Sequence, residues 1–239
     1  AEPNIVLNTV VAESLRQFAD ILENATDFQS EFASLIKKTI REHKRIIFNG
    51  NNYADEWVRE AERRGLSNLQ NTVEALPALV SEKSIGLFTR HRVFSESELH
   101  SRYEIMLENY SKTLHIEALT MIDLVQKGVL PACISYQNEL LQLYSGKKAC
   151  GQFECGPEEY YLERISKLSA CALKKLNNLE NLLIETKNYN GAFSLAKFYR
   201  DNVFAAMSEL RLIVDELETL VAKKHWPLPT YAEILNSVN

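Results

Sequence analysis

The chain has 239 residues, of which 46% are hydrophobic and 25% are charged, and its formal net charge is −5. This is the composition of an ordinary globular protein with a sizeable core, so it excludes disorder over most of the length. The negative charge argues against nucleic acid or an anionic membrane as a partner. With only 8 Gly and 6 Pro, the sequence favours long helices over a turn-rich β fold.

The cysteines and the N-terminal residues indicate in which cellular compartment we expect the protein. The four cysteines are irregularly spaced, unlike a disulfide framework, and we expect reduced thiols in the cytoplasm. No apolar run approaches the ~20 residues of a membrane span. The start, AEPNIVLNTVV, lacks the basic and apolar regions of a signal peptide, and without an initiator Met we interpret Ala1 as a cut point or a processed end.

The first part of the sequence predicts short helices. An apolar stripe predicts a helix over residues 8–24. A capping box at Thr26 and Gln29 then predicts a second helix that reaches residue 45. After the turn signal in IIFNGNN, a short charged helix is expected to end at Gly65, and one further helix is predicted over residues 73–90.

The second part predicts long helices, the first of which opens with a capping box at Ser95 and Glu98. Gly128 and Pro131 are expected to interrupt this helix, which resumes over residues 132–144. Its predicted buried seam alternates spacings of four and three residues and consists of Tyr103, Leu107, Tyr110, Leu114, Glu117, Met121 and Leu124.

Two later segments carry heptad seams, over residues 162–183 and 196–220, and a turn over residues 188–191 joins them. Such helices form an antiparallel hairpin. A main loop is predicted over residues 145–157. Prolines near the end predict an extended tail that packs back through Trp226, Tyr231 and Leu235.

These elements predict an all-α fold in two parts. Short helices occupy residues 1–94, and a long-helix antiparallel bundle with an extended C-terminal tail occupies residues 95–239. The sequence contains no internal repeat, no Gly-rich phosphate loop and no nucleophile elbow.

Two groups of side chains were weighed as metal sites. Cys150 and Cys155 lie in a Gly-containing loop without the second ligand pair that zinc requires, so we interpret them as incidental thiols. Glu96, His100 and Glu104 lie one turn apart on a helix face. Bundle metal sites use such residues, but a solvated, capped helix start explains them as well.

Two charged features remain. Glu117 falls on the predicted seam, where a buried carboxylate would need a cationic partner, and we favour a structural ion pair over a functional site. The second predicted helix carries a basic cluster. The cluster would suit phosphate binding, but we favour a solvated face or a surface that forms salt bridges with another subunit. Its members are Lys37, Lys38, Arg41, Lys44 and Arg45.

Four stretches of the sequence carry a family resemblance: PNIVLNTVVAESLRQFADILE at the start, KRIIFNGNNYADEW, the segment from Asp55 to Met121, and HWPLPTY near the end. They resemble the C-terminal region of type III glutamine synthetases. The resemblance covers nearly the whole chain and is densest over residues 3–130.

The resemblance implies that the catalytic residues lie outside this chain. In glutamine synthetases the metal-binding carboxylates, the ATP site and the glutamate-binding arginines lie upstream, on a barrel whose last strand carries a motif like F-E-x-R. This chain resembles the part that begins at the following helix, so no catalytic, cofactor or metal residue is assigned to it. Adenylylation at a motif of the form N-L-Y-[DE]-L-P is not expected, because Tyr53 lacks the framing Leu and Pro.

The parent reaction implied by the resemblance joins ammonia to glutamate with ATP and Mg²⁺ or Mn²⁺. We expect this chain to be non-catalytic and to pack on the rest of the synthetase chain and on neighbouring subunits of a homo-oligomer. One alternative is a free-standing helical interaction module. Another is a bundle enzyme or metal carrier that uses Glu96, His100, Glu104 and Glu117.

Overall fold

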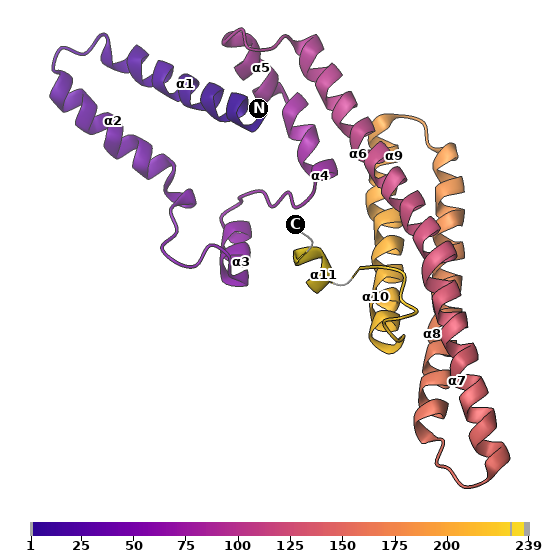
Figure 1. Ribbon diagram of the computed structural model, residues 1–239. Helices are drawn as coiled ribbons and strands as arrows, with labels where there is room; N and C mark the ends of the chain where they lie inside the picture. The colour runs from indigo at the N-terminus through magenta and orange to yellow at the C-terminus, as the bar shows by residue number, and fades with distance from the viewer. Residues whose placement is uncertain (1, 230, 237–239) are drawn as a thin grey trace. The chain divides into compact units, whose positions relative to one another are not determined.

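The computed structural model describes residues 2–229 and 231–236, and this part of the chain is helical and contains no strand (Figure 1). The all-α prediction is therefore confirmed. The chain divides into two compact units, residues 1–106 and 107–239, and the division lies inside one long helix. The predicted division into residues 1–94 and 95–239 rests on helix lengths and stays a prediction.

The first unit consists of short helices and the beginning of a long one. They are α1 (Glu2–Leu22), α2 (Phe28–Glu42), the 3₁₀ turn η1 (Lys44–Ile46), α3 (Asp55–Arg63), α4 (Thr72–Ala75), the 3₁₀ turn η2 (Leu76–Val80), α5 (Glu82–Arg90) and the first turns of α6 (Glu96–Leu124). Helix α1 contacts both α2 and α5.

Local chemistry sets the ends of these helices. Helix α2 begins one residue later than predicted, because the Asp27 carboxylate rather than Thr26 accepts the hydrogen bond from the Ser30 N–H. Gly65 follows α3 with a φ of 68°, the left-handed conformation expected after a helix end. The prediction of one helix over residues 73–90 is wrong. The 3₁₀ turn that contains Pro77 ends it, and Ser81 caps a new helix.

The capping box at the start of α6 is confirmed. Glu98 accepts a hydrogen bond from the Ser95 N–H at 2.8 Å, and the Ser95 hydroxyl accepts one from the Glu98 N–H at 3.2 Å. Two of the backbone donors at this helix end that lack an intrahelical partner are thereby satisfied.

The second unit contains the rest of α6 and the long helices. They are the π turn η3 (Val125–Val129), α7 (Leu130–Cys150), α8 (Gly156–Glu185), the 3₁₀ turn η4 (Thr186–Asn188), α9 (Ala192–Phe198), the π turn η5 (Tyr199–Val203), α10 (Phe204–Leu220) and the short α11 (Tyr231–Leu235). Helix α8 packs along both α7 and α10 (Figure 1).

Helix α6 does not stop at Gly128 and Pro131 as predicted. It runs through η3 into α7, so that Glu96–Cys150 is continuous. Pro131 has no N–H to bond to the carbonyl of Lys127, four residues earlier. Lys127 lies in the wider π turn, which takes up this disruption without breaking the helix. The predicted loop over residues 145–157 is correspondingly short, since α7 ends only at Cys150.

The heptad seams of the hairpin are confirmed. In α8 the side chains of Ile165, Ala172, Leu176 and Leu179 are fully buried. Their partners from the last helices are buried as well and include Ala196, Val203, Leu210 and Leu217. Together with α6 and α7 they form one continuous core.

Three residues are predicted to pack the tail against this core, Trp226, Tyr231 and Leu235. Trp226 is half-buried and packs against the core. Leu235 is 77% exposed, so its predicted packing is wrong. The Tyr231 side chain lies outside the described residues.

Candidate functional site

The cysteine loop, all of whose residues the structure describes, contains no disulfide. Cys133, Cys150, Cys155 and Cys171 are free thiols, of which Cys150 is exposed and Cys155 is buried. Burial raises the pKa of the Cys133 thiol, which disfavours the reactive thiolate.

The predicted metal face is a solvated helix start. Glu96, His100 and Glu104 are all exposed. Within residues 2–229 and 231–236, no group of three or more His, Cys, Asp or Glu side chains is placed to hold a metal ion. The described residues therefore offer no ligand set for the metal-carrier alternative.

The prediction that Glu117 is buried on the seam is wrong. Glu117 is exposed, and the buried positions of α6 run instead through Leu114, Ala118 and Ile122. The predicted seam kept a strict seven-residue repeat, whereas a straight α-helix drifts by ~20° per heptad against such a repeat. After Leu114 the buried stripe has moved one position beyond Glu117.

We therefore expect the substitution Glu117→Leu to change the free energy of unfolding by no more than about 0.5 kcal/mol, because exposed substitutions away from special contacts have small effects. Urea unfolding followed by circular dichroism would measure the change. A loss of several kcal/mol would contradict the exposed position of this side chain.

The basic cluster is a solvated surface on α2 and η1. All five side chains, Lys37, Lys38, Arg41, Lys44 and Arg45, are exposed. The nearest carboxylate described for any of them is that of Glu42, 4.0 Å from Lys38. The cluster is built on neighbouring helix turns.

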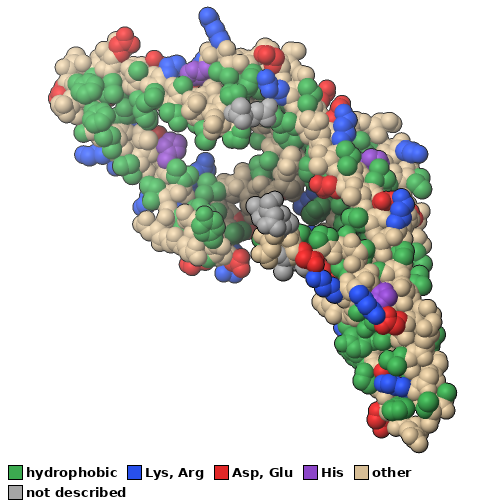
Figure 2. Space-filling view, in the orientation of Figure 1, with side chains coloured by type: hydrophobic (Ala, Val, Ile, Leu, Met, Phe, Trp, Pro, Cys, Tyr) green, Lys and Arg blue, Asp and Glu red, His purple; other side chains and the backbone are tan. Residues whose placement is uncertain are grey.

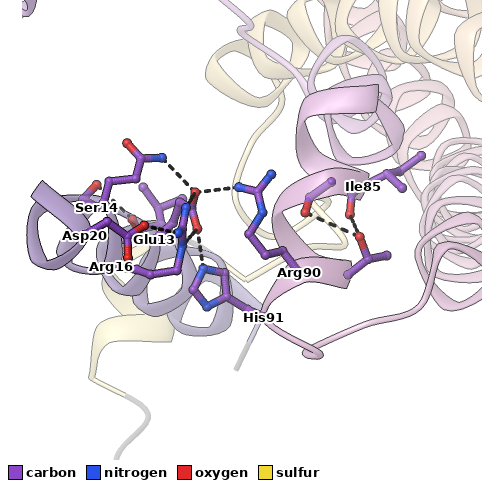
Figure 3. Close-up of polar contacts among 11 residues, drawn as sticks. Glu13, Ser14, Arg16, Asp20, Ile85, Arg90 and His91 are labelled. Carbon is purple, nitrogen blue, oxygen red and sulfur yellow. Dashed lines mark hydrogen bonds and ion pairs between the residues drawn. The ribbon is translucent and has the colours of Figure 1, made fainter.

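The most connected polar cluster of the first unit centres on Glu13, which the sequence did not indicate (Figure 3). The Glu13 carboxylate accepts hydrogen bonds from Arg16 at 3.0 and 3.1 Å and from Gln17 at 2.8 Å, all within α1. It also bonds to Arg90 at 2.6 Å and to His91 at 2.7 Å, at the end of α5. Glu13 therefore ties α1 to α5.

The environment of Glu13 keeps its carboxyl group ionised. Hydrogen bonds from Arg16, Gln17 and His91 hold the pKa of Glu13 far below its usual range, although partial desolvation opposes the shift. A carboxylate with a strongly lowered pKa does not accept a proton near neutral pH, so the cluster is suited to structural support and not to general acid–base catalysis.

Helix α1 has an inverted pattern of burial. Its buried positions are polar, Thr9 and Glu13, with Thr9 donating to the carbonyl of Ile5 at 2.7 Å. Its apolar side chains point the other way, and Leu7, Val11 and Leu15 are 62%, 55% and 62% exposed. At ~100° per residue this apolar stripe lies opposite Thr9 and Glu13. Figure 2 shows hydrophobic side chains at the surface over α1 and α2.

The long helix Glu96–Cys150 meets one membrane criterion. It is the one helix in the described part of the chain that is long and apolar enough to span a bilayer, and a third of its most apolar stretch (33%) is buried inside the protein. Core helices of soluble bundles satisfy the same criterion. The absence of a membrane partner stays a prediction.

Comparison with known proteins identifies the family. Residues 31–148 match the glutamine synthetase C-terminal domain. A glutamine synthetase of Butyrivibrio fibrisolvens is 39% identical over 89% of this chain and 30% of its own length. The type-3 glutamine synthetase of Dictyostelium discoideum is 39% identical over 98% of this chain and 33% of its own length. A glutamine synthetase of Bacteroides fragilis (strain YCH46) is 30% identical over 97% of this chain and 33% of its own length.

The chain belongs to the glutamine synthetases. It corresponds to their C-terminal region, and it is of type 3 by the name of the Dictyostelium relative, which confirms the resemblance seen in the sequence. The chain spans about a third of the length of the curated relatives it matches.

Helix α1 is apolar on its exposed face and polar where it contacts α5. The Glu13 cluster holds the helix on its polar side.

Proposed function

We propose that this chain is the packing and assembly region of a glutamine synthetase, and that it is not catalytic by itself. The parent enzyme would ligate ammonia to glutamate with ATP and Mg²⁺ or Mn²⁺, all bound by residues upstream of those described. The proposed enzyme is a cytoplasmic homo-oligomer. Its remaining chain and its neighbouring subunits are the partners of these helices.

The exposed apolar stripe of α1 carries this proposal. Leu7, Val10, Val11 and Leu15 form one face, and each is at least 45% exposed. Covering such a face stabilises the covered state by about 25 cal/mol per Å² of apolar surface removed from water. Monomeric soluble proteins rarely leave a contiguous apolar face of this kind open. The polar contacts at Glu13 fix the direction in which the face points.

The test is the double substitution Leu7→Asp and Leu15→Asp in the full-length enzyme. The matched control is Ser30→Asp with Ser34→Asp, which adds the same charge at exposed positions of α2 on the face opposite its apolar residues Phe32 and Ile36. Oligomeric state is measured by light scattering and glutamine formation by a coupled assay. We expect the stripe variant to lose assembly and at least about tenfold in activity, and the control to retain both.

If the stripe variant assembles and forms glutamine as the wild-type enzyme does, the proposal is contradicted. The free-standing alternative makes a different prediction. In that case the reading frame upstream of Ala1 would contain no catalytic motifs, and the stripe would be needed only for binding a separate protein.

A further inference from the structure

An apolar groove lies in the second unit, on a different part of the chain from the α1 stripe. Its floor comes from Met121 and Leu124 of α6 and from Leu210 and Val214 of α10, and its volume is about 630 Å³. The C-terminal tail forms a further wall through Leu228 and Pro229. The lining residues all belong to residues 107–239.

The shape of the groove is that of an unfilled position in a helix bundle. Helix α8 packs on α7 and α10, whereas the groove is lined by α6, η3, α10 and the tail. The α6 edge runs from Ile116 to Val129. At 1.5 Å per residue it is ~20 Å long, which matches a helix of about four turns. Apolar residues at spacings of three and four on α10 form the ridge against which such a helix packs.

The rim of the groove is acidic. Glu117 of α6 and Asp215 and Glu218 of α10 line it, with Arg211 as the cation. Arg211 is held by Asp215 at 3.4 Å. For Glu117 and Glu218 the described residues contain no ion pair. A helix that fills the groove would therefore place these carboxylates beside its flanks, and basic flanks would be favoured.

The start of the tail is held against α7 and the π turn. Glu139 of α7 binds Lys224 at 2.7 Å and His225 at 2.8 Å. Pro227 lies against Gly128 in the π turn, where an added Cβ would come within 3.2 Å of the proline ring. These contacts place the chain just before Leu228 at the edge of the groove.

We propose that this groove docks an amphipathic helix with basic flanks, supplied by another polypeptide. Helix α2 of a second copy does not meet this description. At ~100° per residue, its apolar stripe through Phe32 and Ile36 lies opposite its cations Lys38 and Arg41. The inference goes beyond the proposed function and does not depend on it. The proposed function is argued from α1 in the first unit, whereas the groove is lined only by residues of the second unit.

The probe is a labelled designed peptide of about 18 residues, with leucines along one helical face and lysines on both flanks. Its binding to the full-length enzyme is followed by fluorescence anisotropy, so that a groove covered by the rest of that enzyme would not bind the peptide. We expect saturable binding that weakens about tenfold when Glu117→Lys and Glu218→Lys are combined. Thr120→Arg, an exposed change on the groove lining, should abolish binding by filling the groove. A peptide with glutamates in place of the lysines should bind at least about tenfold more weakly.

The matched control is Glu104→Lys with Glu185→Lys, which changes the net charge equally at exposed positions that do not line the groove. Circular dichroism verifies that every variant is folded. Equal weakening in the control and groove variants would overturn the proposal, as would absence of binding to the wild-type chain. Self-association of the chain that Thr120→Arg abolishes would overturn it too, because the occupant would then be a second copy.

Discussion

Replacing Leu176 with alanine is expected to lower the free energy of unfolding of residues 107–239 by about 3 kcal/mol. Leu176 is fully buried on the α8 seam, in the core shared with α7 and α10. Truncation removes its transfer free energy and leaves a cavity that long, straight helices cannot readily close.

The measurement uses the position of the tryptophans, Trp57 in α3 and Trp226 in the tail. In a Trp57→Phe background, urea unfolding followed by fluorescence reports on the second unit alone, since Trp226 packs on its core. The control is Leu173→Ala, on the same helix but 48% exposed, which should cost less than about 1 kcal/mol. Similar losses at both positions would show that the seam is placed wrongly.

The seams of the hairpin could be predicted because their apolar positions recur over many helical turns and lie on one face of each helix. Over residues 162–183 and 196–220, seam positions recur at spacings of three and four for seven and eight positions, and among them only Ser169 is not hydrophobic. Tertiary packing then has little freedom to choose another face. The same rule failed at Glu117, because the buried stripe of α6 drifts away from a strict seven-residue repeat and a π turn follows.

Helix ends were predictable only where one chemical signal stood alone. Ser95 and Glu98 formed the expected capping box, since neighbouring residues offered no stronger cap. At the start of α2, two adjacent residues could cap, and the carboxylate of Asp27 was used in place of the Thr26 hydroxyl. Pro131 predicts a helix break that the structure does not contain, because sequence patterns do not reveal that a π turn will absorb a proline.

The Glu13 cluster could not be predicted, although half of it was visible. Glu13 and Arg16 stand three residues apart on α1, a common surface pair. Its decisive partners, Arg90 and His91, come 77 and 78 residues later, and no local pattern joins them. Glu13 lies opposite the apolar stripe of α1. On an amphipathic helix this polar face is ordinarily exposed to solvent, so the position alone did not indicate a buried carboxylate.

Removing this carboxylate is expected to loosen α1 from α5. In Glu13→Gln, the Arg16 and Arg90 guanidinium groups lose a charged acceptor, and charge-assisted hydrogen bonds are about twice as strong as neutral ones. We expect hydrogen exchange of α1 amides to accelerate at least about tenfold at neutral pH, with α8 amides unchanged. Glu23→Gln, which alters an exposed carboxylate just beyond α1, should leave both rates as they are.

The same contact makes the stability of the first unit depend on pH. Because the pKa of Glu13 is lowered in the folded state, the unfolded chain binds the proton first as the pH falls below the ordinary value of 4.5. The stabilisation is complete above that value and is lost progressively at lower pH. Hydrogen bonds from Arg63 and Arg64 lower the pKa of Glu60 to about 2, which adds a similar dependence.

Melting followed at a series of pH values in a Glu60→Gln background removes the dependence due to Glu60, while Glu98, whose pKa the Ser95 N–H also lowers, is present in both variants that are compared. The melting temperature of the first unit should fall between pH 4.5 and 2 in that background, and the further change Glu13→Gln should flatten the fall. An unchanged slope in the double variant would mean that Glu13 has the same proton affinity folded and unfolded. The tie between α1 and α5 would then contribute nothing to holding the apolar stripe of α1 outward.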